Sequence, residues 1–203
     1  MNLENVALHV PRILLPRPGT DLTRWSVVAC DQFTSQPDYW QQVDELVGSS
    51  PSTLRLTFPE AYLNSVDEDE YLSRIAADME RYLDQGILSP VGDGFVLVER
   101  TTARGALRRG LVVCLDLEHY DFRQGSTSLI RATEGTVVER LPVRVRIRSR
   151  ASVELPHIMV LIDDPEMTVI EPLFGQRLAK LYDFGLMMNG GRIRGYLVDE
   201  QKT

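Results

Sequence analysis

Residues 67–86, with the sequence DEDEYLSRIAADMERYLDQG, constrain the fold more than any other segment of the chain. Four acidic residues come first, which suits the positive end of a helix dipole better than it suits a metal site. Apolar residues then recur at three- and four-residue spacings, and Gly86 follows them as a stop signal. The pattern predicts a helix over 67–86 that buries one stripe. The stripe consists of Leu72, Ile75, Met79 and Leu83.

Short apolar segments separated by turn-forming residues predict strands around this helix. A second helix is expected at 37–48 and a third at 171–187, with a turn at 188–191. Segments 94–102 and 108–117 predict an antiparallel hairpin. The expected strands are 25–30, 54–58, 94–102, 108–117, 157–164 and 192–198.

This order of helices and strands predicts one α+β domain over residues 1–203, with a mixed, mostly antiparallel sheet flanked by helices. The segment 157–164, HIMVLIDD, is apolar enough to be a central strand. We expect the 67–86 helix to pack against a sheet that contains 94–101, 108–117 and 157–163.

Length, composition and charge bound the class of protein. A chain of 203 residues with 43% hydrophobic residues is ordinary for a globular protein. Because no apolar run reaches the roughly 18 residues of a membrane span and the N-terminus lacks a secretory signal, a cytoplasmic protein with no membrane partner is expected. The net charge of −7 argues against a nucleic-acid partner. Cys30 and Cys114 are expected to be buried free thiols, with no metal site.

Residues 129–150 form a basic segment in this acidic chain, since six arginines against two glutamates give it a net charge of +4. Val143, Val145 and Ile147 alternate with arginines, which is typical of an edge strand with one solvated face. Thr136 and Glu139 instead have the spacing of a capping box, which begins a helix. The local pattern leaves both structures open.

Four motifs follow one another along the chain. They are WSVVACDQFTSQPDYW, SSPSTLRLTFPEAYL, IRATEGTVVERLPVRVRIR and ELPHIMVLIDDP. Together they resemble the domain of unknown function 1015 family, and the resemblance covers nearly the whole chain. It implies that residues 139–150 form a basic helix, which would begin near Arg140.

The resemblance also implies site residues. Family members place an Asp at the end of the first strand, here Asp31, and an Arg in the short strand after the first helix, here Arg55. A signature of Arg, Glu and Thr is matched by Arg131, Glu134 and Thr136.

The resemblance has one departure, which concerns length. Family members are usually about twice as long and carry a later His-containing segment. That segment is similar to one in ParB-like domains, some of which are free-serine kinases. Residues 1–203 contain no such segment. The chain therefore resembles the N-terminal part of a longer family, and we expect it to be inactive alone.

The chemistry of these residues suits a small anion. Arg131 presents planar donors for a carboxylate or phosphate, and Glu134 can act as a general base. Thr136 would stand at a helix N-terminus, where anions bind. The arginines that would share one face of a helix are Arg140, Arg144 and Arg148.

Two classes of function follow. In the first, the chain is the phosphate-binding front part of a small-molecule enzyme, a kinase of an amino-acid hydroxyl that uses ATP or ADP with Mg²⁺. Glu134 and Asp31 are then the candidate catalytic residues, and Arg131, partly buried, faces one cleft with Asp31 and Arg55. In the second, the chain is a non-catalytic binding or assembly module whose basic segment pairs with an acidic surface of itself or of a partner. The expected partners are a small anion, a second copy of the chain or a C-terminal partner segment.

Overall fold

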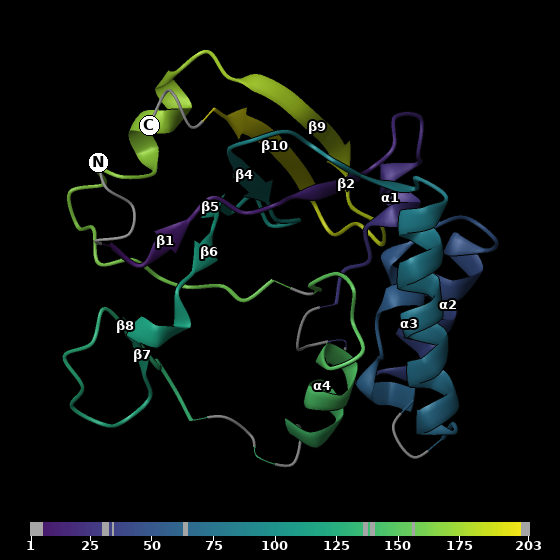
Figure 1. Ribbon diagram of the computed structural model, residues 1–203. Coiled ribbons are helices and arrows are strands. Elements are labelled where there is room, and N and C mark those ends of the chain that lie inside the picture. Colours follow the sequence, from purple (N-terminus) through teal and green to yellow (C-terminus); the bar gives the residue numbers. More distant parts are fainter. Residues whose placement is uncertain are drawn as a thin grey trace.

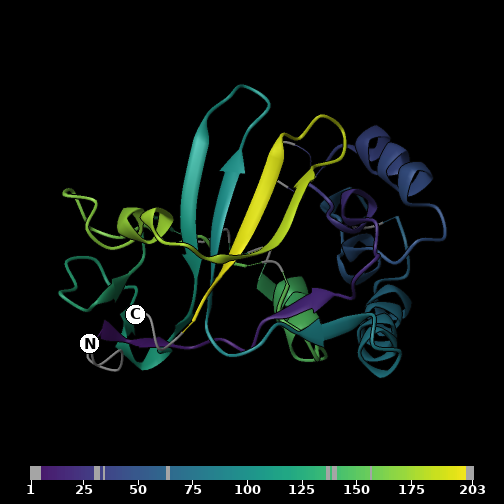
Figure 2. The same ribbon diagram turned by 90° about the horizontal axis from the view of Figure 1, so that it is seen from above.

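A four-stranded antiparallel sheet with a group of helices beside it organises the computed structural model (Figure 1 and Figure 2). The structure describes residues 6–29, 33, 35–62, 65–135, 138, 141–155 and 157–199. Within these residues the α-helices are α1 (Leu22–Trp25), α2 (Pro37–Val47), α3 (Glu68–Asp84) and α4 (Leu141–Arg148). The strands are β1 (Leu8–His9), β2 (Leu14–Pro16), β3 (Leu88–Pro90), β4 (Phe95–Thr101), β5 (Leu107–Val112), β6 (Cys114–Leu115), β7 (Tyr120–Asp121), β8 (Ile130–Arg131), β9 (Ala179–Gly185) and β10 (Arg192–Val198). Short 3-10 helices span Thr53–Leu56, Glu60–Tyr62, Leu117–His119 and Glu171–Gly175.

The central sheet has the strand order β5-β4-β10-β9, and each neighbouring pair is antiparallel. β4 and β5 form the predicted hairpin, and the predicted turn at 188–191 joins β9 to β10. Gly191 in this turn has a φ of +96°, and a Cβ there would stand 2.0 Å from the carbonyl oxygen of Thr101. The left-handed conformation and the close backbone both require glycine. The turn therefore holds β10 between β4 and β9.

One face of the sheet packs on the 3-10 helix Glu171–Gly175. The buried residues of this core are Phe95, Leu97, Leu173 and Val198. Further along the same face, four charged residues of alternating sign stand opposite one another across the strands. In strand order they are Arg109, Glu99, Arg194 and Asp183. Opposite charges in directly facing positions favour this register over a shifted one.

Helix α3 confirms the predicted apolar stripe, since Leu72, Ile75 and Met79 are buried and Leu83 is partly buried. Its main partners in this core are Trp25, Leu56, Ile87 and Leu88. They come from α1, the 3-10 helix Thr53–Leu56 and the start of β3. The prediction that this helix packs against the central sheet is therefore wrong.

Two predicted strands are wrong because short polar side chains cap tight turns in their place. Asp21 caps α1, which ends at Trp25, and residues 26–29 have no regular secondary structure. The Ser52 hydroxyl accepts a hydrogen bond from the amide of Leu54 at 3.2 Å and begins a 3-10 helix inside the expected strand 54–58. Such side chains offer the backbone an alternative to strand pairing.

Two further predictions fail where pairing between distant segments decides the structure. No strand pairs with 157–164 within the described part of the chain, and its apolar side chains are exposed. The predicted helix at 171–187 divides into the 3-10 helix Glu171–Gly175 and strand β9. Pairing of β9 with β10 outweighs the local helical pattern there.

The remaining predicted elements are confirmed. They are α2, α3, β4, β5 and β10. Helix α4 confirms the basic helix that the family resemblance implied, against the alternating local pattern. The fold is α+β, as predicted, and the described strand pairs are antiparallel except for β7 with β8.

Candidate functional site

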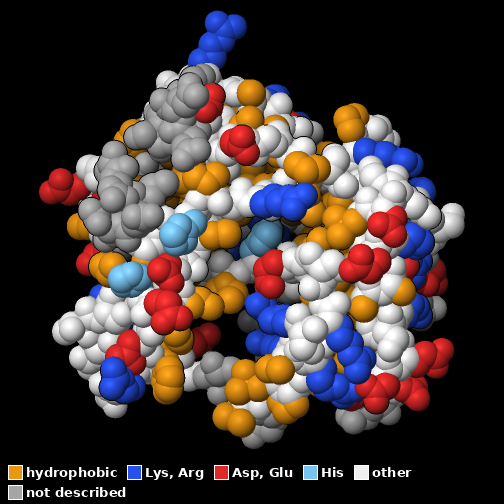
Figure 3. Space-filling view, in the orientation of Figure 1, with side chains coloured by type: hydrophobic (Ala, Val, Ile, Leu, Met, Phe, Trp, Pro, Cys, Tyr) orange, Lys and Arg blue, Asp and Glu red, His pale blue; other side chains and the backbone are white. Residues whose placement is uncertain are grey.

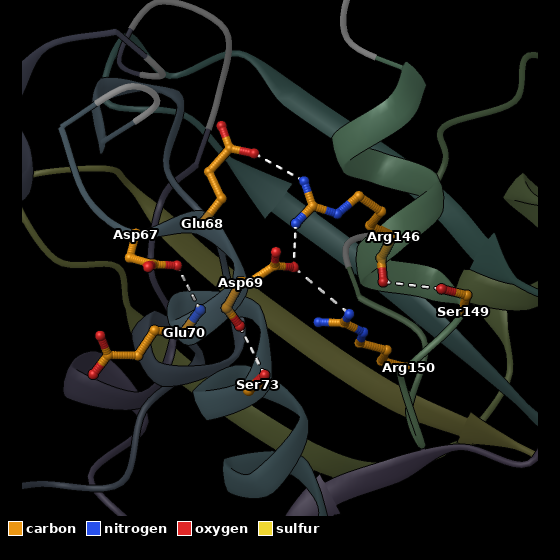
Figure 4. A network of polar contacts seen from close by, with 8 residues as sticks. All are labelled: Asp67, Glu68, Asp69, Glu70, Ser73, Arg146, Ser149 and Arg150. Carbon is orange, nitrogen blue, oxygen red and sulfur yellow. Dashed lines mark hydrogen bonds and ion pairs between the residues drawn. The ribbon is translucent and has the colours of Figure 1, made fainter.

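Ion pairs join helix α4 to α3, and Val143 and Ile147 of α4 are half-buried. None of the eight residues of α4 is buried. Arg146 donates one hydrogen bond to Glu68 Oε2 at 3.0 Å and another to Asp69 Oδ1 at 2.5 Å, and Arg150 lies 3.7 Å from the same Asp69 oxygen (Figure 4). The basic segment therefore pairs with an acidic surface of its own chain.

The acidic surface is the first turn of α3. Asp67 is the N-cap, and its carboxylate accepts a hydrogen bond from the Glu70 amide at 3.0 Å. Glu68 and Asp69 follow it and extend toward Arg146 (Figure 4). The hydrogen bond to Asp69 raises the pKa of the Arg146 guanidinium, and Glu68 adds to this effect. The acid run thus complements the helix start, as predicted, and also receives the arginines.

The opposite face of α4 is open to solvent. Leu141, Arg144, Val145 and Arg148 occupy it at spacings of three and four residues. Val145 is 61% exposed, and within the described residues no acid forms an ion pair with Arg144. Arg148 Nη1 lies 2.7 Å from Glu154 Oε1, but both side chains are largely exposed. Figure 3 shows Lys and Arg side chains over α4, with Asp and Glu side chains near the start of α3.

Spacing explains why the arginines divide between the two faces. Arg144, Arg146, Arg148 and Arg150 are two residues apart. Two residues correspond to about 200° around an α-helix, so alternate arginines point to opposite sides. In the sequence this alternation favoured a strand; on the helix it yields one arginine pair that docks and another that faces solvent.

The predicted cleft shared by Arg55 and Arg131 is not formed. Arg55 donates to Asp44 Oδ1 at 3.0 Å and to the Gly48 carbonyl at 2.6 Å, so it closes the end of α2. Arg131 lies in β8, and Figure 1 and Figure 2 place β8 and α2 on opposite sides of the molecule. Arg131 is exposed, so its predicted partial burial is wrong.

The other predicted site residues are placed as follows. Glu134 is exposed in the connection between β8 and α4. Asp31, Thr136 and Arg140 lie outside the described residues. Cys114 is an exposed free thiol, so the prediction that it is buried is wrong. The described residues contain no cluster of ligands that could hold a metal ion.

Sequence reasoning identified the basic segment but missed the residues that form the contact, namely Glu68, Asp69, Arg146 and Arg150. The signal was present, since an acid run and a basic run occur in the same chain. What the sequence lacks is the information that brings 68–69 beside 146–150.

A separate open hollow lies in the connection between β7 and β8, with a volume of about 670 Å³. Two of its charged residues form an ion pair, since Arg123 Nη2 lies 2.8 Å from Asp121 Oδ2, and Arg123 holds the pKa of that carboxyl well below its usual range. Because Glu118 and Asp121 outnumber Arg123 in its lining, this hollow suits an anionic ligand less well than the outer face of α4.

The model of one protein family, described as "Protein of unknown function (DUF1015)", matches residues 14–203. No curated protein matches the chain, and no solved structure does. None of the helices that the structure describes has the length and apolar character that a bilayer crossing requires.

Proposed function

This chain belongs to the DUF1015 family, whose description names no function, and we propose a function from the geometry of the chain itself. The chain is a binding module that holds an acidic partner on the outer face of α4. The observation that carries the proposal is the bridge from Arg146 to Glu68 and Asp69, which holds one face of α4 and leaves Arg144, Val145 and Arg148 exposed on the other.

The outer face combines the two features that such a partner needs. Arg144 and Arg148 supply guanidinium donors that suit carboxylates. Leu141 and Val145, 40% and 61% exposed, supply apolar contact between them. A partner with carboxylates spaced along an amphipathic surface matches both features.

The net charge of the chain limits the size of the acidic partner. With a net charge of −7, most of the surface repels a long polyanion such as nucleic acid. A short acidic segment on α4 lies within the field of the local arginines, since screening at physiological salt limits longer-range repulsion to about 8 Å. An acidic peptide segment is therefore the partner we propose.

We place binding ahead of catalysis because of where the candidate base Glu134 and the candidate ligand-binding Arg55 lie. Catalysis requires a base held within hydrogen-bond reach of the reacting group. Glu134 is exposed on a connection, and Arg55 is engaged with α2. The arginines on the outer face of α4 need no such partner to bind a carboxylate.

Fluorescence anisotropy with a labelled glutamate-rich peptide tests the proposal. We expect the double variant R144A/R148A to weaken peptide binding by about fivefold or more, since each exposed charge pair contributes up to about 1 kcal/mol. The charge-matched control is R104A/R177A, which removes two exposed arginines away from α4. Added inorganic phosphate distinguishes a general anion site from a site for acidic peptides. A general anion site would release the peptide at low millimolar phosphate, whereas a peptide site would not.

Two results contradict the proposal. One is equal weakening of peptide binding by R144A/R148A and R104A/R177A. Binding would then depend on the net charge of the chain and not on the outer face of α4. The other is a wild-type chain that does not bind the peptide at low salt.

A further inference from the structure

The segment 157–163 carries the largest continuous run of exposed apolar side chains in the described structure. Ile158, Met159, Val160, Leu161 and Ile162 are 76%, 75%, 48%, 75% and 52% exposed. The segment crosses the front of the molecule in Figure 1, and hydrophobic side chains reach the surface there in Figure 3. Side chains on both sides of the chain are exposed, so one packing face cannot account for the run.

The backbone of this segment is also unpaired. No strand pairing and no other backbone hydrogen bond involves 157–163 within the described residues. The segment ends at a closed turn, where the Asp164 carboxylate accepts hydrogen bonds from the amides of Thr168 and Val169. An unpaired apolar segment of β-branched and aliphatic residues is a template for pairing with another strand.

The sequence of this segment is complementary to itself. In an antiparallel pair of two copies with Val160 on the two-fold axis, Ile158 faces the partner's Ile162 and Met159 faces the partner's Leu161. His157 then faces the partner's Asp163, once at each end. A two-fold contact requires this property, because the same surface must fit itself.

The register centred on Val160 is also favoured over the two neighbouring registers that two-fold symmetry allows. A two-fold axis perpendicular to the paired strands keeps each side chain on its own face, so alternative registers differ by two residues. One such shift puts Asp163 opposite the partner's Met159, and the other puts it opposite the partner's Leu155. Both bury a carboxylate against an apolar side chain, whereas the register centred on Val160 does not.

We propose that the chain forms a homodimer through antiparallel pairing of 157–163 with the same segment of a second copy, centred on Val160. The pairing gives partners to the backbone groups along one edge of the segment and places apolar side chains opposite one another on each face. It is independent of the binding proposed for α4, because it uses none of the residues of that helix.

Sedimentation velocity tests the pairing with matched variants. We expect a wild-type dimer and a monomeric V160D, because two aspartates would meet on the axis. L117D is the control, since Leu117 is 72% exposed outside the segment, and it should remain dimeric. Circular dichroism should show that V160D keeps the wild-type fold, since Val160 is 48% exposed. A wild-type monomer at millimolar concentration, or a dimeric V160D, overturns the proposal.

Disulfide formation tests the register, in a background with Cys30 and Cys114 replaced by serine. V160C should cross-link under mild oxidation, since directly facing Cβ atoms are about 4.5–5.5 Å apart. I158C should not, because its copy lies four residues away along the partner strand.

A charge swap tests the same register by a second route. H157D should weaken the dimer, and the double variant H157D/D163H should restore it. Equal cross-linking by I158C and V160C, or no recovery in the swap, contradicts this register.

Discussion

At the scale of single residues, the contact between Tyr182 and Gly195 in the central sheet affects the pKa of the tyrosine. Tyr182 lies over Gly195 of the neighbouring strand, where an added Cβ would stand 2.2 Å from its ring. Burial against this bare backbone raises the pKa of the Tyr182 hydroxyl to about 12. The close packing of Tyr182 on Gly195 therefore has an effect on the pKa that titration can measure.

We predict a tyrosine transition near pH 12 in spectrophotometric titration, which belongs to Tyr182. A raised folded-state pKa means that the contribution of Tyr182 to stability is complete below about pH 10, where an unfolded tyrosine ionises, and is lost as pH rises through about 12. Y182F should remove the late transition and flatten stability over this window. Loss of a transition near pH 10 in Y182F would contradict this assignment.

Gly191 and Gly105 both have positive φ, so a comparison of their alanine variants separates the cost of backbone strain from the cost of a clash. G191A should lower the free energy of unfolding by about 3 kcal/mol, since strained φ adds to a backbone clash with Thr101. G105A meets no atom within 4 Å and should cost only the conformational strain, about 1 kcal/mol. Urea denaturation of the two variants measures the difference, and equal losses would show that the clash is relieved.

At the scale of elements, the ion pairs of Arg146 contribute to the docking of α4 on α3. Because α4 has no buried residue, its docking should weaken as salt screens Arg146 from Glu68 and Asp69. We predict that R146A speeds amide exchange across 141–150, as does added salt for the wild type. R144A, on the opposite face of the same helix, should leave exchange unchanged. Unchanged exchange in R146A would mean that other contacts hold the helix.

Elements also show which predictions a sequence can support. α3, the β4–β5 hairpin and β10 were predictable because periodicity and turn residues lie within each segment. The segments 54–58 and 171–187 were not, since Ser52 capping and β9–β10 pairing override their local patterns. The charge of the basic segment was predictable, but its division into docking and exposed arginines depends on which face meets α3.

At the scale of the whole molecule, the family resemblance correctly favoured a helix at 141–148 but did not place the predicted cleft. The cleft was predicted because Arg55 and Arg131 belong to motifs that follow one another along the chain. The structure separates Arg55 at α2 from Arg131 at β8, and it brings 68–69 beside 146–150 instead. Contacts between distant segments were therefore the part of the site that one sequence could not supply.

Hydrogen exchange of residues 141–150 shows whether α4 docks by one face and binds by the other. It is measured with and without the glutamate-rich peptide in wild type, R144A and R146A. We expect the peptide to protect this segment in the wild type and to protect it much less in R144A. We also expect R146A to exchange faster than both without peptide. Equal exchange in R144A and R146A, with no protection of the wild type by the peptide, would contradict an α4 that docks by one face and binds by the other.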